Sequence, residues 1–454
     1  LYANVAFFII LLGFGLETAY FKFSKSENDQ SKVYGTALTS IAFSGGLFIL
    51  IGLTFTQSIA DFIGYASRPD FIIYLSLILG LDAFSSIPMA KLRNEGNAKR
   101  FAQINLINIG TNIFFNLLFI AYAKTSFDQG NKTALVELLY NPEIGIAYIF
   151  ISNLIATGVK LMLLYPEIIR VKWQINKLLL KRMLIYSLPL MIGNFAGIIN
   201  ETFDRLLLRR VIEPEHGIQF AKEQVGIYSG VYKLSILISL FIQAFRYAAE
   251  PFFFARAKDK NANETYRTVM NYFVLAVASM FLFILLYLEI FKWLLPKTAY
   301  WEGLHIVPVL LMANIFLGIY YNQSIWYKLS GQTKFGAYIA IGGAILTTGL
   351  NLIFIPILGY VASAWTTFLV YGGMMVTSYL LGQKHYPIPY NLKKVFFYLI
   401  FAVGLYGLSL GFKYFFQDSV ILCLGFNTLI FGFYIWFIIK LEGIDVRSML
   451  KKPE

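Results

Sequence analysis

The sequence has little of what a soluble enzyme needs. Only 14% of its 454 residues are charged, and it contains three histidines and one cysteine. A soluble domain carries about 25% charged residues, so most of this chain must contact something other than water. The lone Cys423 excludes an internal disulfide. The three histidines are scattered and form no Cys-x-x-Cys or His-Glu-x-x-His pattern, so we expect neither a metal site nor a cofactor.

What the chain has instead is apolar length. Hydrophobic residues make up 58% of it, with 43 Phe and 30 Tyr. The apolar runs extend over about 20 residues, the length of a membrane-spanning helix, and do not alternate as strands of a membrane barrel would. We therefore expect an all-α integral membrane protein of about 13 spans, with its longest connections near 123–142, 167–182 and 209–224. The expected spans are 1–22, 33–54, 71–90, 101–123, 143–166, 183–208, 225–247, 268–294, 303–326, 335–355, 357–382, 392–412 and 419–440.

The positive charges predict an orientation. The net charge of +13 comes from basic residues in short loops, which is an orientation signal and not a nucleic-acid-binding stripe. Of the 38 Lys and Arg residues, 25 lie on the side reached after the first span, nine lie on the other side and four lie within spans. The first side, and with it the C-terminus, is therefore expected to be cytoplasmic. A cytoplasmic N-terminus would then require one more helix before Leu1, and a cleaved signal peptide is the alternative.

Polar side chains in several spans fall on one helical face. In 225–247 they stay within about 60° of one line at 100° per residue, and they are Tyr228, Tyr232, Ser235, Ser239, Gln243 and Arg246. Other spans carry Asn112 and Asn116, then Asn194, Glu201, Asp204 and Arg205, and also Glu17 and Asp82. Hydrogen bonds between packed helices, and a local Glu201–Arg205 ion pair, would explain some of them. Because striped helices occur in both halves of the chain, we favour a shared water-filled cavity whose cations suit a diphosphate and whose tyrosines suit sugar rings.

Several segments resemble bacterial polysaccharide flippases. They are LLGFGLETAYFKF at 11–23, IPMAKLRNEGNAKRF at 87–101, NETFDRLLLRRVI at 200–212 and VGIYSGVYKLSILI at 225–238. The clearest is LSGQTKFGAYIAIGGAILTTGLNLIFIPILGYVASAWTTFL at 329–369, with its core at Asn351, Ile355, Pro356, Gly359 and Ala364. In their order and spacing, these segments make the whole chain similar to the oligosaccharide flippase branch of the multidrug/oligosaccharidyl-lipid/polysaccharide exporter superfamily.

The resemblance implies a fold and a mechanism. It implies two pseudo-symmetric six-helix lobes around a central cavity, followed by two further helices. The expected parts are an N-terminal lobe at 1–178 with five spans and its first helix missing, a C-terminal lobe at 179–388, and two spans with a tail at 389–454. A lipid-diphosphate-linked oligosaccharide, as in lipopolysaccharide O-antigen synthesis, would enter from the cytoplasm of the inner membrane, and rocking lobes would release it at the periplasmic face.

The resemblance also assigns roles. Arg205 and Arg246 would hold the diphosphate, and the cavity lining would comprise Tyr228, Tyr232, Ser235, Ser239, Gln243, Asn112, Asn116 and Asn194. A coupling proton or cation would bind at Glu17, Asp82, Glu201 or Asp204, since a carboxylate within the membrane is a functional candidate. The expected partners are the lipid-linked oligosaccharide, membrane lipid and other polysaccharide-assembly proteins of the membrane, with no nucleic acid.

Other functions remain open at this point. A small-molecule or multidrug exporter and a lipid II flippase belong to the same superfamily. A membrane glycan polymerase or ligase would have this composition too, but such enzymes need a large outer loop or a cluster of His, Asp and Arg. The sequence has neither, so we expect no catalytic residues and no enzyme activity.

Overall fold

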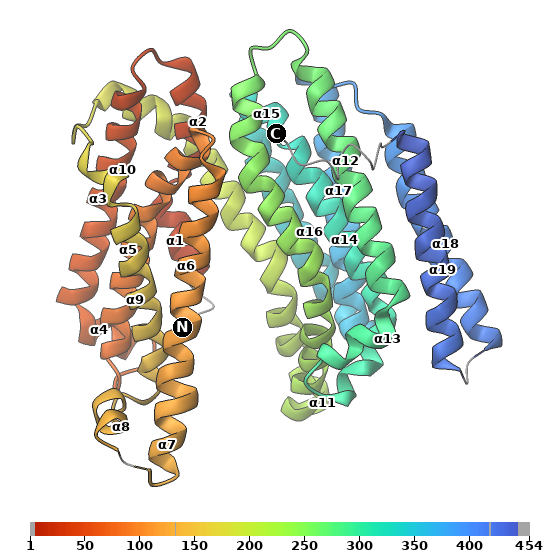
Figure 1. Cartoon of the computed structure of the whole chain (residues 1–454), viewed down its shortest axis with the longest axis horizontal. Helices are drawn as coiled ribbons and strands as arrows, with labels where there is room; N and C mark the ends of the chain where they lie inside the picture. The colour runs from red at the N-terminus through yellow and green to blue at the C-terminus, as the bar shows by residue number, and fades with distance from the viewer. Residues whose placement is uncertain (1–4, 132, 417–418, 444–454) are drawn as a thin grey trace, which may run out of the picture. The chain divides into compact units, whose positions relative to one another are not determined.

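The computed structural model describes residues 5–131, 133–416 and 419–443, and these residues form helices with no strand among them (Figure 1). Eleven of the described helices are long and apolar enough to cross a membrane. One of these, α11 (Lys177–Arg256), runs for 80 residues and is kinked at Gly217, so it supplies two crossings. Helix α17 (Tyr360–His385), which follows the span α16 (Lys334–Leu358), is 26 residues long and is not among these eleven. The expected all-α membrane fold is therefore confirmed.

The chain divides into two compact units. Unit 1 contains the described residues up to Phe195, together with Tyr247–Arg256 and Gly331–Ala337. Its helices before α11 are α1 (Val5–Gly13), α2 (Leu16–Ser26), α3 (Gln30–Thr54), α4 (Thr56–Phe62), α5 (Asp70–Asn94), α6 (Ala98–Asn116) with its π-helical continuation η2 (Leu117–Lys124), α7 (Thr125–Asp128), α8 (Ala134–Leu139), η3 (Gly145–Ala147), α9 (Tyr148–Leu163) and α10 (Tyr165–Ile169). The lobe boundaries expected from the sequence stay a prediction.

Unit 2 contains Ala196–Arg246, Ala257–Ser330 and the described residues from Tyr338. Its other elements are α12 (Ala262–Leu286), α13 (Leu288–Phe291), η4 (Lys292–Leu294), η5 (Thr298–Ile306), α14 (Val307–Gln323), α15 (Ile325–Leu329), α16 (Lys334–Leu358), α17, α18 (Leu392–Phe415) and α19 (Val420–Glu442). Helices α18 and α19 pack on α12, where Asn427 donates to the Leu286 carbonyl at 2.6 Å. A large apolar cluster joins α11, α12, α14 and α18, and it includes Tyr228, Phe273 and Tyr398.

Short polar residues mark where helices begin. The side chains of Asp29, Asn97 and Asn391 accept a backbone N–H three residues further on, which starts α3, α6 and α18. Between α16 and α17 the chain turns at Gly359, whose φ is 56°. A Cβ there would also lie 2.7 Å from the Gln224 side chain, so only glycine fits this tight turn.

The connection expected at 209–224 is wrong. Both sides of it are helical, and only Gly217, with φ 83° and ψ 162°, leaves the helical conformation. The segment is polar, so hydropathy ends the two spans early, but polar residues continue a helix into water as readily as apolar ones. Gly217 turns the chain back on itself, as the contact of Asp204 with Tyr228 across the kink shows. The result is a helical hairpin with a first arm before Gly217 and a second arm after it.

Candidate functional site

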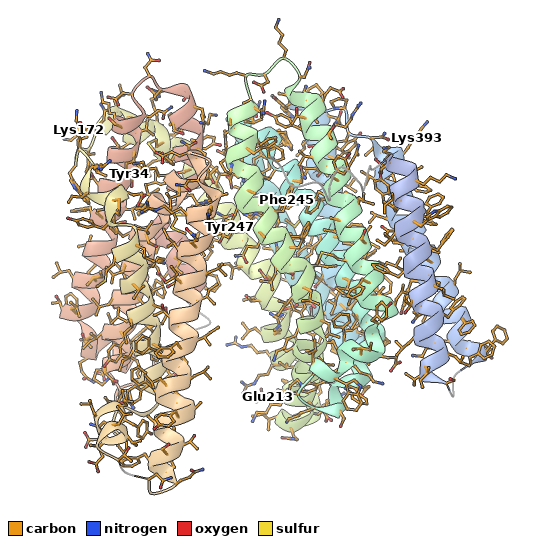
Figure 2. All side chains as sticks on the ribbon, in the orientation of Figure 1. Tyr34, Lys172, Glu213, Phe245, Tyr247 and Lys393 are labelled. Atoms are coloured by element: carbon orange, nitrogen blue, oxygen red, sulfur yellow. The ribbon has the colours of Figure 1, made fainter. Side chains whose placement is uncertain are left out.

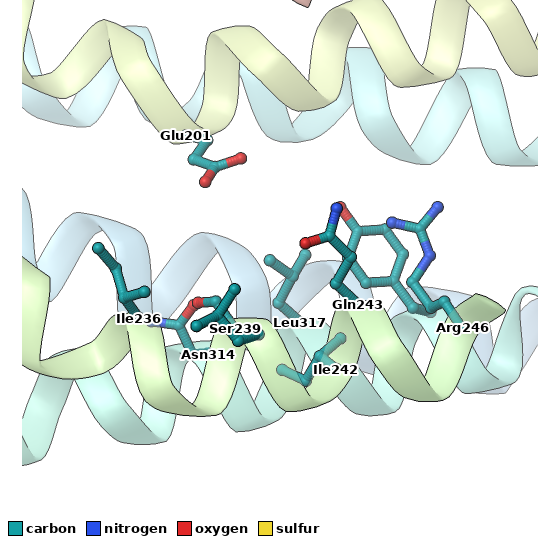
Figure 3. Close-up of a pocket in the computed structure, with 10 residues that line it drawn as sticks. Glu201, Ile236, Ser239, Ile242, Gln243, Arg246, Asn314 and Leu317 are labelled. Atoms are coloured by element: carbon teal, nitrogen blue, oxygen red, sulfur yellow. The ribbon is translucent and has the colours of Figure 1, made fainter. Parts of the chain in front are cut away.

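Unit 2 contains a cavity of about 300 Å³ between the arms of α11 and helix α14. Figure 3 shows Glu201 pointing into it from the first arm, and Gln243 and Arg246 from the second. The lining combines polar and aliphatic side chains, which are Glu201, Ile236, Ser239, Leu240, Ile242, Gln243, Arg246, Asn314, Leu317 and Tyr321. We call this cavity the unit 2 pocket.

The hairpin of α11 holds the pocket walls in register. Tyr228 on the second arm donates a hydrogen bond to the carboxylate of Asp204 on the first, and both residues are fully buried. Arg205 follows Asp204 on the first arm, and its guanidinium lies 4.4 Å from the centre of the Tyr232 ring, one turn after Tyr228 on the second arm. These two contacts fix the arms against each other. Glu201, one turn before Asp204 and Arg205 on the first arm, thereby faces the residues of the second arm that line the pocket.

The polar groups of the pocket are arranged for recognition. The Arg246 guanidinium carbon lies 4.0 Å from the centre of the Tyr321 ring, a cation–π contact that holds the guanidinium in place. Two turns back along the same arm, Ser239 donates to the side-chain oxygen of Asn314 of α14 at 3.0 Å. The pocket therefore presents a planar cation, an aromatic ring, amides and a hydroxyl, which together can bind phosphate and hydroxyl groups. Glu201 adds an acceptor for sugar hydroxyls or for a cation.

Four of the residues expected at the site are brought together in this pocket, namely Glu201, Ser239, Gln243 and Arg246. The others on the hairpin serve the walls. Tyr228 and Asp204 bond to each other, and Ser235 donates to the carbonyl of Tyr232 within its own helix. Arg205 donates to the backbone carbonyl of Glu201 at 3.2 Å, so its guanidinium stays near the pocket without lining it.

The expected residues of unit 1 lie in separate places. Asn116 donates to the side chain of Asn112 at 2.6 Å along α6, and Asn194 is exposed on α11. The two carboxylates of this unit that the sequence predicted as coupling sites are both paired. Glu17 on α2 bonds to Arg93 of α5, and Asp82 on α5 lies 2.6 Å from the ammonium of Lys160 on α9. Thr157 donates a second hydrogen bond to Asp82 at 3.1 Å.

Sequence reasoning missed Asn314, Tyr321 and the pairing role of Lys160. Asn314 and Tyr321 are seven residues apart, which is two turns of α14 and one face. That spacing could have been noticed, but α14 carries few other polar residues and shows no stripe. Lys160 is one of the four basic residues within the expected spans, yet its partner Asp82 is 78 residues away and no local pattern connects them. Among the described residues no group of three or more His, Cys, Asp or Glu side chains could hold a metal ion.

Comparisons with known proteins identify the family and the fold of the chain. Its residues 1–256 match the family model described as "Polysaccharide biosynthesis protein". No curated protein sequence matches the chain. A crystal structure of MATE in the straight conformation superposes with a TM-score of 0.65 at 15% identity, covering 84% of this chain and 85% of the other. An outward-facing multidrug resistance MATE family transporter of the MOP superfamily gives a TM-score of 0.64 at 15% identity, covering 84% of each chain.

A MOP superfamily transporter from Pyrococcus furiosus is similar to the same degree. Its TM-score is 0.63 at 14% identity, and the match covers 84% of this chain and 85% of that one. At such low identity these matches establish the fold, while the family model, which spans more than half of the chain, establishes the family. The chain is thus a multi-pass membrane protein with the fold of MATE transporters, and it belongs to the polysaccharide biosynthesis protein family.

Proposed function

We propose that this protein is a transporter that moves a lipid-diphosphate-linked oligosaccharide from the cytoplasmic to the periplasmic leaflet of the bacterial inner membrane, for the synthesis of a cell-surface polysaccharide. The observation that carries the proposal is the unit 2 pocket, in which a guanidinium, a phenol ring and two amides meet in the membrane part of a polysaccharide-family chain. Polar groups in hydrocarbon cost several kcal/mol unless they are paired or hydrated. A polar pocket among membrane helices is therefore best explained by a polar ligand.

In this proposal Arg246 binds a phosphate oxygen of the substrate, and Tyr321 holds the guanidinium in position. Gln243, Asn314 and Ser239 bind sugar hydroxyls. Arg205 adds positive charge from one side. No bond of the substrate is made or broken during transport. The proposed orientation has the C-terminus in the cytoplasm, because the basic residues are concentrated in the loops on that side.

The carboxylates receive different roles. Among the described residues that line the pocket, Glu201 is the only acidic one, so it is the carboxylate that a bound substrate would contact directly. Asp82, Glu17 and Asp204 are engaged by Lys160, Arg93 and Tyr228, and each of these pairs could take up a coupling proton or cation only by rearranging. Glu201 is therefore the first candidate for coupling.

The test is transport by purified protein in proteoliposomes, with a fluorescent lipid-diphosphate oligosaccharide as substrate. A charge-assisted contact contributes about 1.5–3 kcal/mol, so Arg246→Ala should slow flipping at least about tenfold. Arg246→Lys should recover only part of the rate, because a lysine lacks the planar donor pair. The matched control is Arg209→Ala, which removes an exposed arginine of the same helix that pairs with Glu213 outside the pocket. Equal rates for the wild type, Arg246→Ala and Arg209→Ala would refute the assignment of the pocket.

The nearest alternative is export of a small molecule or drug, which is supported by the MATE fold. The arginine in the pocket disfavours the organic cations that are common drugs. Accumulation of ethidium in cells that express the protein separates the two functions. Active ethidium export, with no flipping of the lipid-linked sugar, would favour the exporter. A lipid II flippase is tested in the same liposomes by replacing the oligosaccharide with lipid II.

A further inference from the structure

The segment 165–182 connects the end of α9 to the first turns of α11 and lies wholly in unit 1. We call it the interfacial segment. The membrane-spanning part of α9 ends at Leu163 and that of α11 begins at Lys177, so the segment lies where the chain leaves and re-enters the membrane. It exposes five large apolar side chains, including Trp173 at 52% and Leu178 at 71%. The others are Tyr165, Ile169 and Ile175.

Exposed cations alternate with these apolar residues. Arg170, Lys172, Lys177 and Lys181 are all exposed, and none of their side chains makes an ion pair or a hydrogen bond within the described part of the chain. The nearby carboxylates cannot neutralise them because they are already engaged. Glu167 is buried and pairs with Arg100 at 3.1 Å, and Glu27 pairs with Arg182 at 2.8 Å. Four positive charges are left without a counter-charge.

The interfacial segment is also held rigidly. The carbonyl of Lys172 lies so close to α3 that a Cβ on Gly35 would be 2.5 Å from it. The backbone N–H of Asn176 donates to the Thr36 hydroxyl at 3.3 Å. The Trp173 ring stacks parallel to Phe84 with centroids 6.3 Å apart.

A further bond ties the start of the segment to the same helix. The Tyr34 hydroxyl of α3 donates to the carbonyl of Glu167 at 3.0 Å, and Figure 2 shows Tyr34 and Lys172 at the same end of unit 1. A flexible linker would not need these contacts. They fix the four cations and the exposed tryptophan as one surface, so little conformational entropy would be lost when a ligand binds to it.

We propose that the interfacial segment is a binding surface for anionic phospholipid headgroups. Tryptophan and apolar side chains enter the headgroup region of a bilayer, and clustered Lys and Arg residues attract anionic lipids electrostatically. We assign phospholipid as the ligand of this surface, and not the diphosphate of the transported substrate, because the four cations are exposed and dispersed over 12 residues. The inference is independent of the substrate proposed for the unit 2 pocket.

Trp173 offers a direct readout. The full-length protein is reconstituted in bilayers that contain the same mole fraction of either brominated phosphatidylglycerol or brominated phosphatidylcholine, and tryptophan quenching is measured. The contribution of Trp173 is the part lost in Trp173→Phe. We expect brominated phosphatidylglycerol to quench this part at least about twofold more strongly than brominated phosphatidylcholine does, and we expect the preference to weaken in high salt.

Two charge variants complete the test. The first replaces Arg170, Lys172, Lys177 and Lys181 with Gln and should abolish the preference. The control replaces Lys258, Lys260, Lys384 and Lys393 with Gln, which removes the same charge from exposed positions on the same expected side of the membrane. This control should keep the preference. Equal quenching by the two lipids in the wild type, or equal loss of preference in both variants, would overturn the proposal. Flipping rates in the same samples report separately on the unit 2 pocket.

Discussion

The ion pair between Lys160 and Asp82 gives the sharpest prediction about stability. The ammonium of Lys160 lies 2.6 Å from a carboxylate oxygen of Asp82, and the side chains are 11% and 25% exposed. At an effective dielectric constant of about 20 the attraction amounts to about 6 kcal/mol. Removing both charges from water costs several kcal/mol per ion, so the net contribution of the pair is small. Breaking the pair is a different matter, because one charge then stays buried alone.

The penalty for breaking the pair comes from the charge that stays buried. Removing one partner of a buried ion pair costs about 3–5 kcal/mol, because the remaining charge has no counter-charge. Lys160→Met should therefore lower the free energy of unfolding by about 3–4 kcal/mol, and so should Asp82→Asn. The double variant should lose only about 1 kcal/mol.

The assay is reversible unfolding in mixed micelles, followed by circular dichroism at neutral pH. Lys99→Met, at an exposed position of α6, is the control for loss of a lysine. Single variants that lose less than about 1 kcal/mol, or a double variant as unstable as the sum of the singles, would each refute the reasoning. The double variant is also useful for transport. If it folds but does not flip the substrate, the pair has a role in coupling beyond stability.

Three further predictions follow from the packing, each measured as the change in unfolding free energy in micelles. Gly45→Ala should cost about 1–3 kcal/mol, because the new Cβ would meet the Gly80 carbonyl at 2.9 Å where α3 packs on α5. The control Gly46→Ala adds a Cβ in open space and should be neutral or slightly stabilising. Gly217→Ala should cost about 1–3 kcal/mol through its backbone conformation alone, since nothing lies within 4 Å of the new Cβ; no loss would mean that the kink tolerates a side chain. Arg93→Lys should cost about 1–3 kcal/mol although the charge is retained, because the Arg93 guanidinium lies about 5 Å from each of the rings of Phe21, Phe101 and Tyr247. The neutral control is Lys99→Arg. Equal stability of Arg93→Lys and the wild type would contradict the contribution of the aromatic rings.

The sequence predicted the spans well because the hydropathy of a membrane helix is a local property. A run of about 20 apolar residues is sufficient for a crossing, whatever the rest of the chain does. The errors occurred where helices leave the membrane. The polar stretch around Gly217 was interpreted as a loop, although one backbone conformation there is enough to reverse a continuous helix. Helix ends in water are set by single residues such as glycine, and hydropathy does not report on these.

The candidate site was predictable only in part, for a physical reason that the unit 2 pocket illustrates. A polar face along 225–247 predicted that Ser239, Gln243 and Arg246 share a surface, and they do. A single helical stripe, however, does not specify what lies opposite it. Tyr228 belongs to the same stripe, yet it faces Asp204 in a dry contact, while Arg246 faces Tyr321 at the pocket. The neighbouring helices decide which part of a polar helix face lines a cavity. Here the deciding residues belong to α14, and they are too few to form a pattern of their own.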